Sequence, residues 1–466
     1  MPLIQSYTLK NFKGIEKVTI DLQDRTNSPV TTLIGLNESG KTTVLEALSQ
    51  WVSGDKSVSG LFEGIHAKSS GTGLIPVHKK AAFSGRIEIT GLVQLTAADI
   101  KKASSIARAQ SLIIDEEALS RPFAVSRVFD FEDSILKQSR NTWAFELSVR
   151  GLRASKFVRS GADAAVWKAV QKQLAEDMPQ IAYFPTFLVD MPSRIYLGEH
   201  ANETAVNRHY RYVFQDILDS LDGGLSLEKH VCQRIADFKN SENTPLWFSM
   251  FFGSSDRGLV DSVFQRISHA VTREVLGSWH RVFQRTISAK NISVEWNVDT
   301  QKDNLPYASF YVTDGESKYA ISERSLGFRW FFSFLLFTGF KQAQARSTIF
   351  IFDEPAANLH ARAQAELLTS FSKIASDGNR VIYSTHSHHM INPQWLSGAY
   401  IVENTALDYD GGDNFEPSTK PTNVKITKYR DFVAQYPSRS SYFQPVIEKL
   451  EYSTPAVIGH PHYVIV

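Results

Sequence analysis

The chain has 466 residues, a length that suggests about two or three domains with large cores. Its 50 Lys and Arg residues offset 49 Asp and Glu residues, so no global basic field indicates nucleic acid, and only a local patch could bind it. Cys232 is the only cysteine, which excludes a disulfide framework and fits a reducing compartment; we interpret it as a buried thiol in a helix.

Neither a targeting segment nor a membrane span is indicated. The N-terminus runs Met-Pro-Leu-Ile-Gln directly into an alternating strand pattern, without a basic region followed by an apolar one. The most apolar run, Trp330 to Phe340, predicts a helix that is too short to span a bilayer. We therefore expect a soluble, cytoplasmic protein with no membrane partner.

The first part of the chain is rich in predicted strands. Alternation of apolar and polar residues predicts two of them at Leu3–Lys10 and Glu16–Leu22. The same pattern returns at Gly85–Leu95, Val125–Phe131 and Trp143–Arg150, which indicates an antiparallel meander.

A phosphate-binding pattern follows the third predicted strand. Val30 to Ile34 predicts a buried strand and Thr43 to Leu48 an amphipathic helix. Between them, Gly35 to Thr42 has the spacing G-x-x-x-x-G-K-[ST], in which backbone N–H groups cradle phosphates, the lysine neutralises them and the threonine hydroxyl reaches Mg²⁺. This strand-to-helix context argues against a chance glycine turn. The residues predicted to bind the nucleotide here are Gly35, Asn37, Glu38, Ser39, Gly40, Lys41, Thr42 and Thr43.

Helical periodicity dominates from about residue 155. Ala164–Met178, Val206–Leu221 and Leu259–Phe283 carry apolar residues at i, i+3 and i+4. We therefore predict a helical insertion over residues 155–285.

Strands return after the predicted insertion. Asn291–Val298, Tyr307–Thr313 and Lys318–Ile321 have strand patterns, with Asp314-Gly315 as a turn between the last two. The composition of Asp408–Pro421 predicts a loop or linker.

An acidic pair marks the next buried strand, Thr348 to Phe352. Asp353 and Glu354 would emerge at its carboxyl end, the edge of an α/β sheet where ligands bind. Their place at this edge of the sheet predicts that Asp353 holds Mg²⁺ and that Glu354 accepts a proton from the water that attacks a γ-phosphate. A strand that merely ends in a solvated acidic turn is the alternative, and the phosphate loop in the same chain argues against it.

A third buried strand, Arg380 to Thr385, ends on His386. An imidazole at that edge can hydrogen-bond the γ-phosphate or the attacking water, so His386 is a candidate catalytic sensor. His388 and His389 raise the alternative of a metal site. Adjacent strand positions point to opposite faces and no suitable carboxylate or cysteine accompanies them, so we favour a solvated or core role.

The order of phosphate loop, long insertion, Asp-Glu strand and Thr-His strand resembles the ABC-type ATPases of the SMC, RecF and OLD group. The resemblance implies an α/β fold, in which an ABC-ATPase head with a mixed sheet and an antiparallel β subdomain is split by a mainly helical insertion. It covers roughly residues 1–95 and 290–405. On this basis we assign 1–154 to the N-terminal half of the head, 155–285 to the insertion, 286–405 to the C-terminal half, and 406–466 to a tail that completes the head or docks a partner.

The resemblance also implies a signature turn before the Asp-Glu strand. Ser325 and Gly327, in the run Ser-Leu-Gly-Phe-Arg at the start of the predicted apolar helix, match it in position. In this group two heads dimerise head to tail, so Ser325 and Gly327 of one copy would cap the γ-phosphate bound by Lys41 of the other. ATP and Mg²⁺ are therefore the implied ligands, and a homodimer or higher homo-oligomer the implied assembly.

Two parts of the sequence bear on the branch of the group. The run Asn358-Leu359-His360 is similar to the OLD-like branch and argues against a membrane transporter's motor. Either Gln94 or the segment 181–194 could correspond to the group's glutamine loop.

The tail, Gly459 to Val466, has a strand-like pattern and lacks the glutamate and acidic cluster that an OLD nuclease's Toprim domain would supply. We interpret it as completing a sheet of the ATPase, which implies an effector supplied in trans.

We therefore expect an ATP-binding and hydrolysing protein that engages DNA or a phage component and controls a partner nuclease or toxin, as in PARIS-like and Septu-like anti-phage systems. Three alternatives stay open: a RecF-like DNA-repair ATPase, the ATPase half of an OLD nuclease without its Toprim part, and a nucleotide-gated scaffold with negligible turnover.

A local basic patch is the remaining candidate for DNA. Arg150, Arg153, Lys156 and Arg159 are spaced about three apart, which would put several of them on one face if the segment is helical. A solvated charged face is the alternative interpretation of the same spacing.

Overall fold

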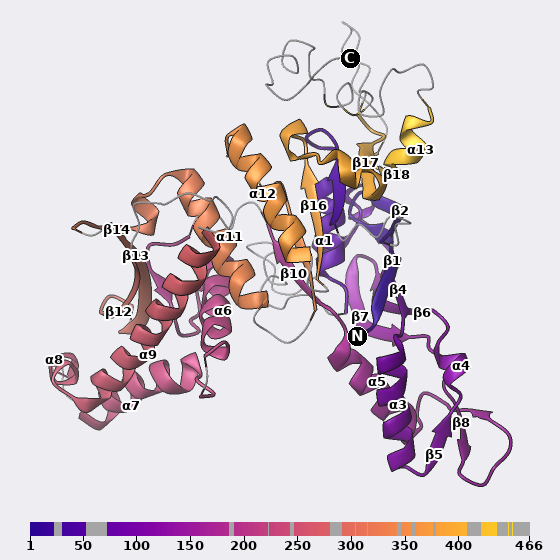
Figure 1. Ribbon diagram of the computed structural model, residues 1–466, viewed down its shortest axis with the longest axis horizontal. Helices are drawn as coiled ribbons and strands as arrows, with labels where there is room; N and C mark the ends of the chain where they lie inside the picture. Colours follow the sequence, from indigo (N-terminus) through magenta and orange to yellow (C-terminus); the bar gives the residue numbers. More distant parts are fainter. Residues whose placement is uncertain are drawn as a thin grey trace, which may run out of the picture. The chain divides into compact units, whose positions relative to one another are not determined.

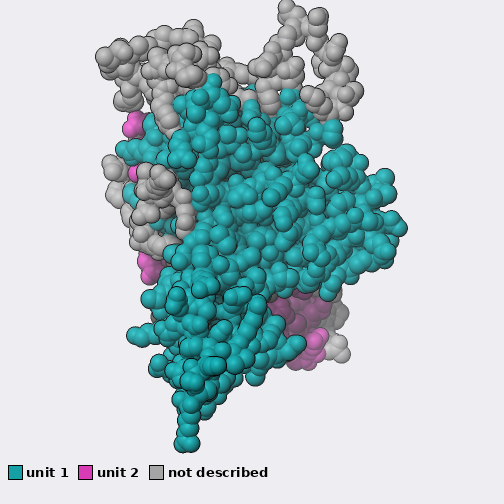
Figure 2. Space-filling view, turned by 90° about the vertical axis from the view of Figure 1, so that its right-hand side faces the viewer, with its two compact units in different colours: residues 1–185, 346–357, 370–466 teal, residues 186–345, 358–369 magenta. Residues whose placement is uncertain are grey.

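The computed structural model divides the chain into two compact units, which Figure 2 colours separately. Unit 1 comprises residues 1–185, 346–357 and 370–466, and unit 2 comprises residues 186–345 and 358–369. The structure describes residues 1–22, 30–52, 72–185, 191–221, 223–242, 247–279, 291–302, 304–314, 316–342, 347–355, 359–375, 379–407, 421–435, 446 and 450.

The centre of unit 1 is a six-stranded sheet of order β10-β15-β16-β3-β17-β18 (Figure 1). Its first five strands are parallel, and β18 adds an antiparallel edge. Their bounds are β3 Val30–Ile34, β10 Gln180–Phe184, β15 Thr348–Phe352, β16 Arg380–Thr385, β17 Ala399–Asn404 and β18 Val424–Lys428. Apolar runs fill β3, β15 and β16 because both faces of the sheet are covered. The three strands predicted to carry the chemistry are therefore neighbours with their carboxyl ends at one edge.

A second, antiparallel sheet of order β2-β1-β4-β6-β7 lies in the same unit. Its strands are β1 Leu3–Phe12, β2 Ile15–Asp21, β4 Gly85–Gln94, β6 Phe123–Glu132 and β7 Ile135–Trp143. The predicted alternation is confirmed for β1, β2, β4 and β6. The predicted strand Trp143–Arg150 is wrong in its middle, because β7 ends at Trp143 and the next strand, β8, begins only at Ser148.

Helix α1, Lys41–Ser49, contacts strands of both sheets, namely β1 on one side and β10, β15 and β16 on the other. Trp51 follows the C-terminal end of the helix and packs it against the antiparallel sheet. Its indole N–H donates to the carbonyl of Val125 at 2.8 Å, and its ring meets Tyr7 edge-on at 5.3 Å. A Cβ atom on Gly91 of β4 would lie 2.5 Å from the Trp51 ring, so glycine leaves the room that the indole occupies.

The rest of unit 1 includes a small lobe of helices and short strands. Helices α3 Ala97–Ala109 and α5 Ala165–Asp177 contact each other, and strands β5 Leu112–Ile114, β8 Ser148–Gly151 and β9 Val158–Arg159 form a sheet of order β5-β8-β9. Helix α4, Glu116–Leu119, follows β5, and helix α13, Tyr429–Val433, follows β18.

The four basic residues that would share a face in a helix lie instead on the hairpin β8–β9, so the helical condition is not met. Arg150 and Arg159 are in the two strands, and Arg153 and Lys156 are in the connection. Arg150 donates to the carbonyl of Ala154 at 2.7 Å, and Arg159 pairs with Glu146 at 3.3 Å.

Unit 2 contains a four-stranded antiparallel sheet covered by helices. Its strands are β11 Ile195–Tyr196, β12 Asn291–Asp299, β13 Leu305–Thr313 and β14 Lys318–Ala320. Its helices include α6 Ala205–Asp219, α7 Gln233–Glu242, α8 Trp247–Phe252, α9 Ser255–Val271 and α11 Leu326–Gln342, with π-helical turns at Glu228–Cys232 and Thr272–Leu276. Helix α12, Ala361–Ile374, lies in unit 2 up to residue 369 and in unit 1 beyond it. Phe310 of β13 joins the layers, since its ring lies 5.3 Å from Phe214 of α6 and 5.4 Å from Phe332 of α11.

The division into units differs from the predicted boundaries in two places. Strand β10 and helix α5 fall in the predicted insertion, 155–285, yet β10 pairs with β15 in the central sheet of unit 1. Strands β12 to β14 and helix α11 fall in the predicted C-terminal half of the head, yet they belong to unit 2. Of the predicted tail, β18 extends the central sheet, whereas residues 408–420 and 459–466 lie outside the described residues.

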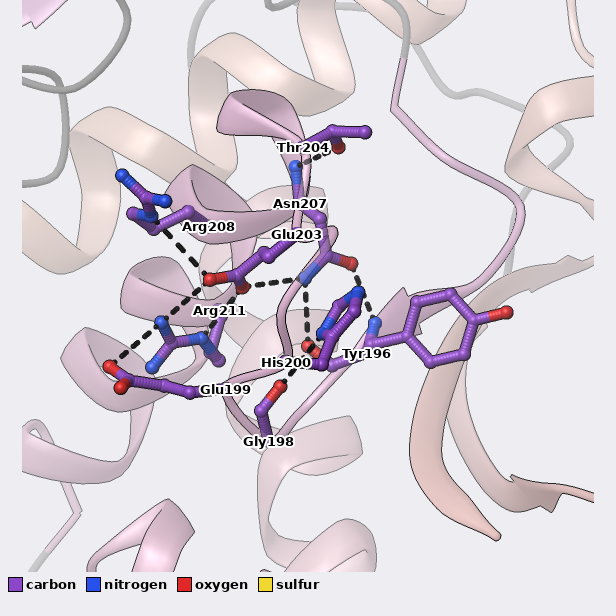
Figure 3. A network of polar contacts seen from close by, with 9 residues as sticks. All are labelled: Tyr196, Gly198, Glu199, His200, Glu203, Thr204, Asn207, Arg208 and Arg211. Carbon is purple, nitrogen blue, oxygen red and sulfur yellow. Dashed lines mark hydrogen bonds and ion pairs between the residues drawn. The ribbon is translucent and has the colours of Figure 1, made fainter. Parts of the chain in front are cut away.

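A buried ion-pair network fixes α6 to β11 within unit 2 (Figure 3). The side chain of Glu203 is 4% exposed and accepts from Arg211 at 2.9 and 3.0 Å and from Asn207 at 2.8 Å. The amide of Asn207 in turn bonds both backbone groups of Tyr196. Burial acts to raise the pKa of Glu203, but the hydrogen bonds from Arg211 and Asn207 outweigh it and lower that pKa.

Within the described part of the chain, no helix combines the length and apolar character needed to cross a membrane.

The Glu203 network gives a first prediction. Glu203→Gln should lower the free energy of unfolding of unit 2 by about 3 kcal/mol, because it removes a buried charge and leaves Arg211 without its main partner. Urea unfolding followed by tryptophan fluorescence measures the change.

Glu199→Gln is the matched control for this prediction. Glu199 also pairs with Arg211, at 3.2 Å, but its side chain is 78% exposed, so the change should be within about 0.5 kcal/mol. The Glu203 contribution is present above the ordinary Glu pKa of about 4.3 and disappears as the pH falls through the lowered pKa of the folded state. Equal effects of the two substitutions would contradict the assignment.

A second prediction concerns the packing of the Trp51 ring against Gly91 of β4. Gly91→Ala should destabilise the protein by about 1–3 kcal/mol, because the new methyl group displaces the indole that holds the end of α1. Gly151→Ala should change stability by no more than about 0.5 kcal/mol, since a Cβ there meets nothing within 4 Å. Thermal unfolding of both variants tests the pair, and an unchanged Gly91→Ala variant would refute the prediction.

Candidate functional site

The loop Gly35–Thr42 joins β3 to α1 at the edge of the central sheet. Gly40 has a φ of +98°, a conformation that favours glycine, and a Cβ there would collide with Val424 of β18. Glu38 also has a positive φ, +62°, and its carbonyl accepts from the side chain of Asn404 at 3.4 Å. The loop is therefore held in its shape by neighbouring strands.

Lys41 lies inside this loop, with its side chain only 5% exposed. Its Nζ donates to the carbonyl oxygens of Gly35 and Leu36, both at 2.8 Å. The same ammonium lies 3.1 Å from Oε1 of Glu354, which follows β15. A buried cation thus meets a carboxylate from far along the chain.

Thr42 and Asp353 form the second contact between α1 and the end of β15. The Thr42 hydroxyl lies 2.9 and 3.1 Å from the two carboxylate oxygens of Asp353. Burial raises the pKa of Asp353, and hydrogen bonds from Ser384 and Thr42 act in the opposite direction. A hydroxyl beside a carboxylate is the oxygen-donor set that Mg²⁺ prefers, so the residues present fit this ion.

Glu354 adopts a φ of +45°, which costs a non-glycine residue about 1 kcal/mol or more. Its Oε2 lies 2.9 Å from Nδ1 of His386, the residue after β16. Burial acts to raise the pKa of Glu354, but the hydrogen bond from His386 and the charge of Lys41 outweigh it and lower that pKa. The bond to Glu354 correspondingly raises the pKa of His386.

Two residues that the sequence patterns did not single out also adjoin Asp353. The Ser384 hydroxyl of β16 donates to Oδ1 of Asp353 at 2.7 Å. Tyr183 of β10 is buried, and both burial and the neighbouring Asp353 carboxylate raise its pKa. A serine or tyrosine inside a buried strand carries no motif, so only the pairing of the strands reveals these neighbours.

The structure thus brings together five of the predicted site residues in unit 1: Lys41, Thr42, Asp353, Glu354 and His386. In the loop, Asn37 and Glu38 are exposed, Ser39 is buried and Thr43 is half-buried. Ser325 and Gly327 belong to unit 2, where Ser325 precedes α11 and Gly327 lies in its first turn. Their roles toward a nucleotide stay predictions.

The structure also places Gln94, the histidine pair and Cys232, which the sequence analysis considered as lesser candidates. Gln94 ends β4 in the antiparallel sheet, where its side chain bonds that of Gln5. His388 and His389 lie in a 3₁₀ turn rather than on a strand, and the described residues contain no group of three or more His, Cys, Asp and Glu side chains that could hold a metal ion. Cys232 ends a π-helical turn and is half-buried, and burial raises its pKa to about 12.

Residues 30–392, more than half of the chain, match the family described as "AAA domain, putative AbiEii toxin, Type IV TA system". A search of curated proteins found no match.

Two solved structures have similar folds. One is a Smc head domain with an extended coiled coil bound to the C-terminal domain of ScpA, from Pyrococcus furiosus, with 12% identity, coverage of 94% of this chain and 99% of that chain, and a TM-score of 0.42. The other is a SmcHead bound to the C-winged helix domain of ScpA, with 14% identity, coverage of 91% and 97%, and a TM-score of 0.41. Both TM-scores lie below 0.5, so the family match alone bears on function.

A third prediction concerns the buried pair Lys41–Glu354. In a double-mutant cycle of Lys41→Met and Glu354→Gln, the coupling in the free energy of unfolding without nucleotide should be about 1–3 kcal/mol, because each charge stabilises the other inside the protein.

The exposed pair Lys137–Glu132, on β7 and β6 at 3.3 Å, is the control, with an expected coupling below about 0.5 kcal/mol. Similar coupling in both cycles would show that burial adds nothing to the Lys41–Glu354 contact.

Proposed function

We propose that this chain, which belongs to the AAA-domain family matched by residues 30–392, binds ATP with Mg²⁺ and hydrolyses its terminal phosphate. One observation carries the proposal. The ends of three neighbouring parallel strands bring Lys41, Asp353, Glu354 and His386 into direct contact around a glycine loop at a helix N-terminus. This set provides a cation, an oxygen-donor pair and a carboxylate, which are the groups that phosphoryl transfer to water requires.

The loop and Lys41 would bind the phosphates. Backbone N–H groups at the start of α1 attract anions, and the ammonium of Lys41 adds a full positive charge. Thr42 and Asp353 would hold Mg²⁺, which supplies charge neutralisation to the phosphate oxygens when it is bound. The same ammonium is held by Gly35, Leu36 and Glu354, so a phosphate would have to compete with those oxygens for it.

Glu354 would act as the general base and His386 as its partner. The lowered pKa of Glu354 keeps its carboxylate ionised and able to accept a proton from water. His386 donates to the other oxygen of the same carboxylate and remains more than a third exposed, so it can also reach a phosphate. Release of Lys41 from Glu354 on phosphate binding would free one carboxylate oxygen for the water.

A small pocket in unit 1 lies beside the start of β18. Its volume of about 150 Å³ is below the roughly 300–1,000 Å³ of drug-sized ligand sites, so we propose that it takes one part of the nucleotide and not the whole nucleoside. Polar side chains from the β1–β2 turn, the 3₁₀ turn at Val77–Lys79 and the start of β18 line it: Asn11, Lys13, Glu16, His78 and Asn423. Val424, which follows Asn423, touches the Cβ position of Gly40, so the pocket adjoins the phosphate loop.

The site is proposed to be completed by a second copy of the chain. Ser325 is exposed and accepts from the N–H of Phe328 in the first turn of α11, which leaves other N–H groups of that turn available for an anion. Ser325 and Gly327 of one copy would then meet the γ-phosphate held by Lys41 of another, and ATP would stabilise the dimer by mass action.

The proposed output of this cycle is control of a partner effector, a nuclease or toxin, in anti-phage defence. The description of the matched family names a putative toxin and a type IV TA system for the AAA domain itself, which supports a toxin-based setting and leaves the separate effector as a proposal. DNA or a phage component is the proposed trigger.

Turnover is the fourth prediction. The wild type should hydrolyse ATP in the presence of Mg²⁺. Lys41→Ala should lose nucleotide binding, whereas Glu354→Gln should bind ATP and lower kcat by about 10²-fold or more, because the base is lost and the binding groups remain. Phosphate release and analytical ultracentrifugation with and without ATP measure turnover and assembly together.

Glu199→Gln, the same chemical change on an exposed residue of unit 2, should leave turnover unchanged. ATP-dependent assembly without any turnover in the wild type would replace the enzyme by a nucleotide-gated scaffold. Normal hydrolysis by Glu354→Gln would refute the assignment of the base.

A further inference from the structure

Ser384 occupies the fully buried position on β16 that lies beside the acidic pair of β15. In the parallel register Phe352 is opposite Tyr383, so the next residue on each strand, Asp353 and Ser384, are neighbours where the sheet ends. The position is therefore set by strand pairing, and not by a loop.

One hydroxyl group at this position makes two hydrogen bonds. Oγ of Ser384 donates to Oδ1 of Asp353 at 2.7 Å. The same oxygen accepts from the backbone N–H of Glu354 at 2.9 Å. Both the donor and an acceptor site of the hydroxyl are thus used, by the side chain of one acidic residue and the backbone of the next.

Each bond restrains a different part of the acidic pair. The first fixes the rotation of the Asp353 carboxylate, whose oxygens also face the Thr42 hydroxyl. The second holds the backbone of Glu354, whose φ of +45° is unfavourable for a residue with a side chain. That backbone turn is what directs the Glu354 carboxylate toward Lys41 and His386.

We propose that Ser384 is a positioning residue that orients Asp353 for Mg²⁺ and Glu354 for the attacking water at once. The proposal rests on the proposed function of the site. It assigns to the end of β16 two side chains at alternate positions, Ser384 in the strand and His386 just after it, that act on the two successive carboxylates that follow β15.

The test uses the full chain with Ser384→Ala, Ser384→Thr and the control Ser126→Ala. Ser126 of β6 is also buried and its hydroxyl is also hydrogen-bonded, to that of Thr90 at 2.8 Å, but it lies in the antiparallel sheet. Four quantities are measured: Mn²⁺ affinity by electron paramagnetic resonance with a non-hydrolysable ATP analogue, ATP affinity without metal, kcat, and the thermal midpoint.

Ser384→Ala should lower both the Mn²⁺ affinity and kcat by about 10–100-fold, the usual effect of losing a hydrogen bond to a metal-binding carboxylate. ATP affinity without metal should stay at the wild-type value. Ser384→Thr, which keeps the hydroxyl oxygen, should recover part of both losses, and Ser126→Ala should alter only the thermal midpoint.

A lower thermal midpoint of Ser384→Ala with unchanged Mn²⁺ affinity and kcat would overturn the proposal, as it would show a merely structural serine. A fall in kcat with unchanged Mn²⁺ affinity would overturn the role toward Asp353. Absence of turnover in the wild type would count against the proposed function, while the Mn²⁺ affinities would still decide the role of Ser384.

Discussion

Burial of charge at the end of the central sheet is the constraint on which the rest of unit 1 depends. Lys41 and Asp353 are each only 5% exposed, and an unpaired ion so placed would cost several kcal/mol. Compensation requires the end of β15 to face the start of α1, which the order β15-β16-β3 achieves. The strand order of the sheet and the ion pairs at its edge therefore depend on each other.

The site was predictable where chemistry coincides with a local pattern. The glycine loop, the acidic pair and the histidine each stand at the end of an apolar run, so the sequence placed Lys41, Asp353, Glu354 and His386 at one sheet edge. It did not reveal that Lys41 pairs with Glu354, because that contact depends on strand order. Ser384 was missed for the same reason, since a serine in a buried strand resembles any small residue.

The fold was predictable where periodicity runs long and unpredictable where an element is short. The five residues of β10 stand among helical patterns, and nothing local shows that they pair with β15. The basic run from Arg150 to Arg159 has helical spacing, yet strand pairing with β5 overrides it. In unit 2 the strand β11 precedes a long helical stretch and the strands β12 to β14 follow it. The sequence patterns therefore did not show that these strands form one sheet.

The chain passes between the two units four times, and the acidic pair lies between two of these passages. The chain enters unit 2 after β10 and returns to unit 1 before β15. It enters unit 2 again at residue 358, only four residues beyond Glu354. The carboxylates thus lie in a segment of unit 1, residues 346–357, that has a passage at each end. Only three residues separate Glu354 from the next residue of unit 2, so the covalent chain itself links the acidic pair to the central sheet on one side and to unit 2 on the other.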